Sequence, residues 1–401
     1  MNAATRWALV ALVVGVGSPT ALAGDFLGVD EAVGAALTRS PELAAAAADR
    51  EAALAQQRQD AVFLANPEAS ASASLAGKGK QSVEVSQPLS LTGEGWAARA
   101  SDRATIEGAT ADWARTRLQV AAEARAAWAE GVIASGGARL ARESLDLAVG
   151  LREAVEKKKT AGEASDLDLR LARLSEASAA SAWLAARREE DEAHLRLVSL
   201  VGNVAFALPD DPLSAAPKPS RPAETRSDVL AAQARVRAAE AGLARARAAA
   251  MPAIALGAFA ERDGADLSVG PSLGLEVPLW NRNQAEIARS AGEASLRRAE
   301  AEQAGAVAAA ERERAAALTR DAQPWVALAT TGLLDDASAA LAEVDAGYRA
   351  GELDLSDAIQ IRGEVLDGES AVLDLAGQVV HARLDFLLAT EDPALLPENA
   401  R

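Results

Sequence analysis

The chain has no cysteine among its 401 residues. This absence excludes disulfides, thiolate metal sites and a lipid-anchored N-terminal cysteine. Aromatic residues make up only 3% of the sequence, whereas alanine is abundant. Such a chain cannot build a bulky globular core, but it can build long helices that pack closely through small side chains.

Basic residues are outnumbered, 41 Lys and Arg against 58 Asp and Glu, and the formal net charge is −17. Nucleic acid is therefore not expected as a partner, while a cationic or neutral cargo is compatible. The chain lacks a nucleophile elbow, a His-Glu zinc signature and a carboxylate pair in a plausible cleft, so we expect neither enzymatic activity nor a cofactor. His194 and His381 occur at equivalent places on long helices, which favours helix packing over metal binding.

Beyond the first residues, no segment has the roughly 18 uninterrupted apolar residues that a membrane helix needs. Residues 1–23 are typical of a secretory signal peptide: Arg6 precedes an apolar stretch, and Ala21-Leu22-Ala23 offers a cleavage site. A signal anchor is the competing interpretation. If the exported chain crosses a membrane, it must use β-strands, because only these can satisfy the backbone without helices.

The strongest positive feature is internal repetition at an offset of about 187–190 residues. Thr38-Arg39-Ser40 returns as Thr225-Arg226-Ser227, and Ala161-Gly162-Glu163 returns as Ala350-Gly351-Glu352. Each half must therefore be one structural unit. We predict a first repeat over 24–206, a Pro-rich linker over 207–224, a second repeat over 225–390 and a C-terminal tail over 391–401.

Both repeats show the same order of elements: a helix, a β-hairpin, a long helix, a turn and a returning helix. In the first repeat these are a helix over 29–64, strands over 68–75 and 81–89, a helix over 95–158, a turn over 160–165 and a helix over 166–201. In the second repeat they are a helix over 227–250, strands over 253–260 and 267–279, a helix over 284–348, a turn over 349–354 and a helix over 355–390.

The long helices are predicted to extend over roughly 90 Å, at 1.5 Å per residue. Ser135-Gly136-Gly137 and Gln323-Pro324 interrupt the two copies at equivalent places, which predicts a bend in each. Ordinary tolerance of glycine and proline on solvated helices is the alternative. In the last helix, residues Ile359, Leu366, Leu373, Val380 and Leu387 are spaced by seven, as in a coiled-coil seam.

Two hairpins give only four strands, and even the smallest membrane barrels need about eight. The chain is therefore expected to assemble with copies of itself. Three copies would supply twelve strands.

Together with this architecture, several motifs resemble those of the TolC-type outer-membrane efflux factors. The opening over 29–43 is similar to the first helix of that family. The run Val277-Pro278-Leu279-Trp280-Asn281-Arg282-Asn283-Gln284 is similar to its strand-to-helix junction, most closely to that of the heavy-metal-efflux, CzcC-like branch. The Gly-x5-Asp segments at 162–168 and 351–357 resemble its periplasmic tips.

The resemblance implies a mostly α fold with a small β part, built from the duplicated helix–hairpin–long helix–helix unit. It implies a homotrimer with a 12-stranded outer-membrane β-barrel continued by an α-helical periplasmic barrel, in a Gram-negative bacterium. The implied function is a passive exit duct of a tripartite, RND-type efflux system for heavy-metal cations. Its partners would be a periplasmic adaptor, an inner-membrane RND pump and outer-membrane lipid.

Three alternatives remain open. Within the same class, the duct would serve efflux of drugs or organic compounds, or type I secretion. From another class, the chain would be a soluble periplasmic coiled-coil adaptor or spacer.

The tip turns hold the main candidate residues. Gly162 and Gly351 mark the turns, and Asp168 and Asp357 begin the returning helices. Six such carboxylates in a trimer would form a ring that attracts cations and gates the mouth; stabilisation of the helix N-termini is the simpler role. Tyr348 resembles a family tyrosine that bonds to carboxylates across the closed mouth, or it packs in the heptad seam. Lys159, at the equivalent place, is predicted to pair with Asp168 or Asp357.

A second group lies where strands meet helices. Pro88 and Pro278 close the two apolar runs. Trp96 and Trp280 follow them, and they are predicted to mark a membrane interface, where aromatic rings prefer to lie, or else to pack at the corner. Asn281 or Asn283 is predicted to cap the following helix.

Overall fold

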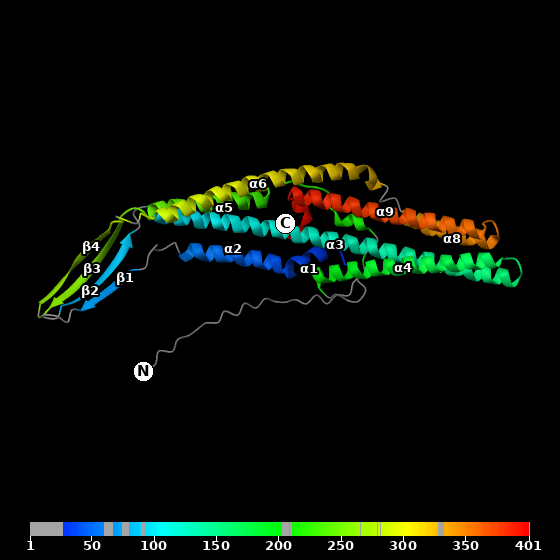
Figure 1. Ribbon diagram of the computed structural model, residues 1–401, viewed down its shortest axis with the longest axis horizontal. Helices are drawn as coiled ribbons and strands as arrows, with labels where there is room; N and C mark the ends of the chain where they lie inside the picture. Colours follow the sequence, from blue (N-terminus) through cyan, green and yellow to red (C-terminus); the bar gives the residue numbers. More distant parts are fainter. Residues whose placement is uncertain are drawn as a thin grey trace, which may run out of the picture.

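The computed structural model describes residues 27–59, 67–73, 80–89, 93–202, 208, 211–264, 266–278, 280, 282–327 and 333–400. The predicted signal peptide and the tip of the first hairpin, including Lys78, lie outside these ranges. The molecule is elongated. A β-sheet lies at one end, the two turns that each connect a pair of helices lie at the other, and long helices run side by side between them (Figure 1).

The N-terminal region forms two helices, α1 (Val29–Arg39) and α2 (Pro41–Gln59). The single helix predicted over 29–64 is therefore wrong at Ser40. Pro41 disfavours helical dihedrals in the preceding residue and has no N–H to donate. The Ser40 hydroxyl accepts a hydrogen bond from the Leu43 amide at 3.1 Å, so the break is also the capped start of α2.

The two hairpins join in one antiparallel sheet of order β1-β2-β3-β4. Its strands are β1 (Glu68–Ala73), β2 (Gln81–Leu89), β3 (Ala253–Asp263) and β4 (Asp266–Glu276). Both predicted hairpins are confirmed. The pairing of β2 with β3, from Gln81 with Arg262 to Leu89 with Ile254, joins the two repeats and was not predicted. At Gly257 an added Cβ would lie 2.5 Å from the Val85 carbonyl oxygen, so this join requires glycine.

The sheet has two chemically different faces, because side chains alternate along each strand and paired residues share a face. One face is apolar and exposed: Leu273 and Val269 are both 72% accessible. The opposite face presents mostly small and acidic residues, with Phe259 among them. The apolar face comprises Ala69, Ala71, Ala73, Val83, Val85, Leu89, Ile254, Leu256, Ala258, Ala260, Leu267, Val269, Pro271, Leu273 and Leu275, together with Gln81, Gln87 and Arg262.

The longest helix, α3 (Glu94–Thr160), has 67 residues and extends over roughly 100 Å. It continues without interruption through residues 135–137, so the predicted break is wrong in the first repeat. An added Cβ on Gly136 would lie 3.5 Å from Leu373 of α9 (Leu355–Ala389), and one on Gly137 would lie 3.8 Å from it. The two glycines therefore lie against Leu373 within a continuous helix, and a Cβ at either position would make an ordinary van der Waals contact.

The second long helix is interrupted where Pro324 predicted it. Helix α6 (Gln284–Ala322) ends in the 3-10 turn η2 (Gln323–Trp325), and α8 (Leu333–Ala350) leads to the second tip. Helices α4 (Asp166–Val201), α5 (Ser227–Ala248) and α9 end within two residues of the predicted bounds. The heptad seam of α9 is buried at Val380 and Leu387, both fully inaccessible.

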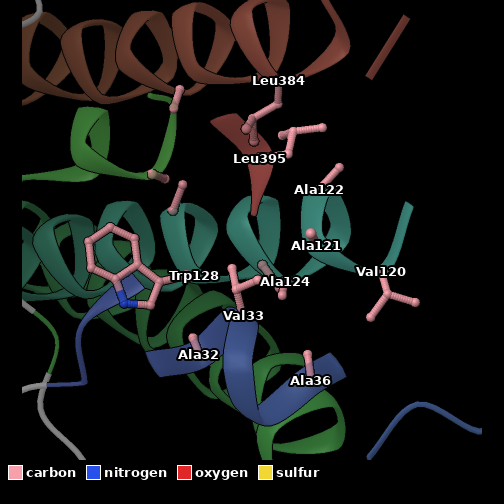
Figure 2. Packing of buried hydrophobic residues seen from close by; sticks show 14 of the residues in the cluster. Ala32, Val33, Ala36, Val120, Ala121, Ala122, Ala124, Trp128, Leu384 and Leu395 are labelled. Atoms are coloured by element: carbon pink, nitrogen blue, oxygen red, sulfur yellow. The ribbon is translucent and has the colours of Figure 1, made fainter. Parts of the chain in front are cut away.

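One apolar core lies halfway along the molecule, where α1, α3, α9 and the C-terminal segment meet. Figure 2 shows Val33 and Ala36 of α1 facing α3, with Leu384 of α9 and Leu395 on the other side. Trp128 of α3 is 1% accessible and donates its indole N–H to the Leu27 carbonyl at 2.8 Å. Apart from this indole, the core consists of small and aliphatic side chains, as the composition predicts.

The predicted linker and tail both pack against this core. The 3-10 turns η1 (Pro212–Ala215), η3 (Pro393–Leu395) and η4 (Glu398–Ala400) belong to these segments. The buried Asp392 carboxylate accepts hydrogen bonds from the amide and the hydroxyl of Ser220, at 2.8 and 2.6 Å. These two hydrogen bonds therefore join the segment between the repeats to the C-terminal tail.

Candidate functional site at the helical tips

The first tip joins α3 to α4 through a glycine in the left-handed region. Gly162 has φ +82°, and its amide donates to the Lys159 carbonyl at 3.0 Å. The next amide, of Glu163, donates to the Lys158 carbonyl at 2.8 Å. These two bonds form a Schellman motif, which satisfies the last carbonyls of α3 and reverses the chain.

A capping box then starts α4. The Asp168 amide donates to the Ser165 hydroxyl oxygen at 3.2 Å, and the Asp168 carboxylate accepts from the Ser165 amide and hydroxyl, both at 2.8 Å. These hydrogen bonds, the one from the backbone first, hold the pKa of Asp168 below its usual value. Asp168 therefore stabilises the helix start and remains ionised at neutral pH.

The second tip repeats the backbone with different side chains. Gly351 has φ +79°, and the amides of Gly351 and Glu352 donate to the carbonyls of Tyr348 and Gly347 at 3.2 and 2.9 Å. Asp354 takes the place of Ser165 and accepts from the Asp357 amide at 2.8 Å. This hydrogen bond and a second from Ser356 lower the pKa of Asp354.

The side chain of Asp357 is exposed, and no hydrogen bond or ion pair to its carboxylate occurs within the described part of the chain. The predicted equivalence with Asp168 therefore holds for position in the helix but not for bonding.

The two tips lie side by side at one end of the molecule (Figure 1). The Lys158 ammonium stands 4.3 Å from the ring centroid of Tyr348, a cation–π contact between the first tip and the second. Tyr348 is 4% accessible and packs within the apolar cluster of the tip helices. Burial, and secondarily the charge of Asp168, raises the pKa of the Tyr348 hydroxyl.

Lys159 is placed differently from the prediction. Within the protomer its ammonium pairs with Asp166 at 2.5 Å, not with Asp168 or Asp357. The hydrogen bond from Lys159, and then its charge, lowers the pKa of Asp166. The turn carboxylates therefore remain anionic and exposed, although no group of three or more potential metal ligands occurs among the described residues.

The strand–helix junctions lie near the opposite end. Trp96 and Trp280 are 76% and 91% accessible, so neither packs at the corner within the protomer. Pro88 lies within β2 opposite Ala255, and Pro278 follows β4. Asn281 lies outside the described residues. Asn283 precedes α6 with φ 58° and donates its side-chain amide to the Ala246 carbonyl at 2.9 Å, so it ties α6 to α5.

The sequence interpretation missed three groups. Lys158 was overlooked although it is the middle one of three consecutive lysines before the tip. Arg362 and Glu369 are buried charges of α9, 6% and 3% accessible, and neither was singled out. Both stand three residues after a heptad seam position, and this is the signal that could have identified them.

Comparison with known proteins identifies the fold. Residues 219–390 match the family described as outer membrane efflux protein. The structure is similar to that of CusC, with a TM-score of 0.73, 19% identity and coverage of 90% of this chain and 91% of that chain. It is also similar to a membrane protein from Pseudomonas aeruginosa, with a TM-score of 0.70, 23% identity and coverage of 90% and 93%.

A third similar structure is the CmeC outer membrane channel of Campylobacter jejuni, with a TM-score of 0.74, 16% identity and coverage of 90% and 85%. No curated protein matches the chain in sequence. Among the described helices, none is both long enough and apolar enough to cross a membrane. The matched family consists of efflux ducts rather than enzymes, in agreement with the sequence prediction. Residues 219–390 thus match the outer membrane efflux protein family, and the chain as a whole has the fold of TolC-type efflux channels.

Proposed function

We propose that three copies of this chain assemble into an outer-membrane exit duct. The observation that carries the proposal is the four-stranded sheet with one exposed apolar face. Strands β3 and β4 have 11 residues each, the length that a tilted strand needs to span a bilayer. Lipid is the solvent that would cover Leu273, Val269 and their neighbours on this face.

The sheet edges support assembly. Strands β1 and β4 are the outer strands, each with one neighbour in the protomer. Unpaired backbone groups cannot remain in hydrocarbon, because no water is there to bond them. Pairing β4 of one copy with β1 of the next satisfies both edges, and three copies close a wall of twelve strands with the helices continuing below it.

The soluble adaptor is disfavoured by the same sheet. A soluble chain would leave Leu256, Leu267 and Leu275 in water, at 51%, 69% and 64% accessible, as one contiguous patch. The long helices alone are compatible with either class of protein. The exposed apolar face of the sheet is the feature that favours a membrane duct over a soluble adaptor.

A matched pair of substitutions tests the proposal. Leu273→Arg places a charge on the apolar face, and Ser272→Arg places it one residue away on the polar face. An arginine toward lipid costs about 2–4 kcal/mol at the bilayer midplane, and three copies multiply this cost. We expect Leu273→Arg to abolish trimers in the outer-membrane fraction and Ser272→Arg to retain them. Equal assembly of both variants would refute the lipid-facing assignment.

For the cargo, we propose heavy-metal cations, taken up through a periplasmic adaptor and an inner-membrane RND pump. Supporting features are the net charge of −17, the exposed Asp357 at the tip, and carboxylates on the polar sheet face at Glu84 and Asp266. Such surfaces raise the local concentration of cations. Deletion should sensitise cells to zinc, cobalt or cadmium; lost tolerance of organic compounds with unchanged metal tolerance would assign the duct to drug efflux instead.

A further inference from the structure

Helix α9 carries a buried carboxylate for which the described part of the chain supplies no hydrogen-bond partner. Glu369 is 3% accessible, and both of its carboxylate oxygens are inaccessible to solvent without a hydrogen bond from any described group. An ionised carboxylate in such a place is strongly unfavourable unless it is paired. Either the group holds a proton, or the packing around it must change.

The charges around Glu369 favour the proton. Two charged residues of α3 affect the pKa of Glu369 in opposite directions: the charge of Glu143 raises it and the charge of Arg139 lowers it. Glu143 accepts a hydrogen bond from the Ser338 hydroxyl of α8 at 2.8 Å. Burial first, and then the charge of Glu143, raises the pKa of Glu369 to about 7 against the opposing charge of Arg139.

The contact beside Glu369 is suited to movement. One turn further along α9, Leu373 rests against Gly136 and Gly137 of α3, which offer no side chains to interlock. Beyond it, an added Cβ on Gly377 would stand 3.3 Å from Ile133. At the other end, the buried Arg362 donates to the Ser144 hydroxyl of α3 at 2.9 Å and to the Ser175 hydroxyl of α4 at 3.0 Å.

We propose that Glu369, Glu143 and Ser338 form a proton-dependent latch that holds α9, and with it the α8–α9 tip, against α3. Protonated Glu369 fits the closed packing. Ionised Glu369 is repelled by the charge of Glu143 and has no hydrogen-bond donor among the described residues, so α9 shifts until the carboxylate reaches water. The latch is closed in acid and released toward neutral pH. Its effect on the mouth rests on the proposed duct, whereas the movement of α9 does not.

The sign follows from the two protonation equilibria. With a pKa of about 7 in the closed latch and the ordinary 4.5 once solvated, the closed state binds the proton more tightly. The equilibrium constant for closing the latch is largest below pH 4.5. It falls by up to about tenfold for each pH unit between pH 4.5 and pH 7, and it no longer changes above pH 7.

Hydrogen exchange of the full chain in detergent measures the latch directly. After correction for the intrinsic rate, amides of α9 around Glu369 should exchange at least tenfold faster at pH 7.5 than at pH 5. Glu369→Gln mimics the protonated acid and should abolish this difference. Glu143→Gln removes the like charge and should move the transition to lower pH. Glu364→Gln, an exposed acid of the same helix, is the control and should match the wild type.

A pH dependence that persists in Glu369→Gln would overturn the latch. Planar-bilayer recordings then distinguish it from the proposed function. We expect the wild type to conduct more at pH 7.5 than at pH 5, by a ratio that Glu369→Gln lowers and Glu364→Gln does not. Absence of any channel would refute the duct while the exchange result stands. Channels with the same pH ratio in all variants would refute the coupling of the latch to the mouth.

Discussion

Arg125 is the residue whose loss should most weaken the middle of the molecule. It lies on α3, is 3% accessible, and joins three segments that are distant in sequence. Its guanidinium donates to the Leu395 carbonyl at 2.7 Å, the Ala215 carbonyl at 3.2 Å and the Asp30 carboxylate at 2.7 Å. The tail, the inter-repeat segment and α1 therefore meet at one side chain.

The magnitude can be worked from these bonds. Arg125→Met keeps much of the apolar stem but leaves two buried carbonyl oxygens unpaired, each at about 1–3 kcal/mol. The Asp30 carboxylate is 58% accessible and can turn to water, so it adds little. The total is about 2–6 kcal/mol. With an unfolding entropy on the order of 0.8 kcal/mol/K for a chain of this size, Tm should fall by about 3–8 °C.

Arg196 offers a matched control. It pairs with Glu130 at 2.7 Å, the same distance as Arg125 to Asp30, but its side chain is 53% accessible. Arg196→Met should therefore lower stability by at most about 1 kcal/mol. Thermal unfolding followed by far-UV circular dichroism in detergent compares the two variants. Equal shifts in Tm would show that burial and the carbonyl bonds do not set the contribution of Arg125, and the reasoning would fail.

Three further predictions concern the helices and the tips. Gly136→Ala should stabilise the protein by about 0.5–1 kcal/mol, because the added Cβ has room and alanine favours the helix. Gly162→Ala should destabilise it by about 1–2 kcal/mol, because alanine is strained at φ +82°. Thermal unfolding of both variants tests the opposite signs. Glu369→Gln should match the wild type near pH 4.5 and exceed its stability by up to about 3 kcal/mol at pH 8, because the folded state with a pKa of about 7 binds the proton that the unfolded state releases at 4.5; urea titrations at the two pH values check this, and equal differences at both would contradict it. Asp357→Asn should reduce cation selectivity in bilayers without changing stability, whereas Asp168→Asn should also lower the free energy of unfolding by about 0.5–2 kcal/mol, because it weakens the cap of α4. Unchanged selectivity in Asp357→Asn would show that Asp357 does not act at the mouth.

Local sequence signals predicted most of the elements, because turns and caps depend on a few neighbouring residues. The tip glycines, the hairpins and the returning helices are of this kind. The break at Ser40 was missed although Pro41 is visible in the sequence, since the apolar pattern continues across it. The opposite error occurred at Gly136, where a glycine pair suggested an interruption but lies against Leu373 within a continuous helix.

Long-range features were less accessible to sequence. The pairing of β2 with β3 joins residues about 170 apart, and nothing local specifies it. The buried charges could have been found: with Leu366 and Leu373 as seam positions, Arg362 and Glu369 fall on the second seam of the heptad. A charged residue there is expected to be buried, and it therefore requires either a partner or a function.

The duplicated tips show how the two repeats have diverged while keeping one backbone. Both tips need glycine at the left-handed position and an oxygen acceptor at the helix start. Glycine therefore stands at both positions, Gly162 and Gly351, while the capping residues differ. With Ser165 as the cap, the Asp168 carboxylate is engaged by two hydrogen bonds, whereas with Asp354 as the cap the second acid, Asp357, is left exposed. A threefold assembly would then alternate fixed and free carboxylates around its mouth rather than present six equivalent ones. Any gating charge should therefore be sought on the second tip, where a substitution changes the field without changing the helix.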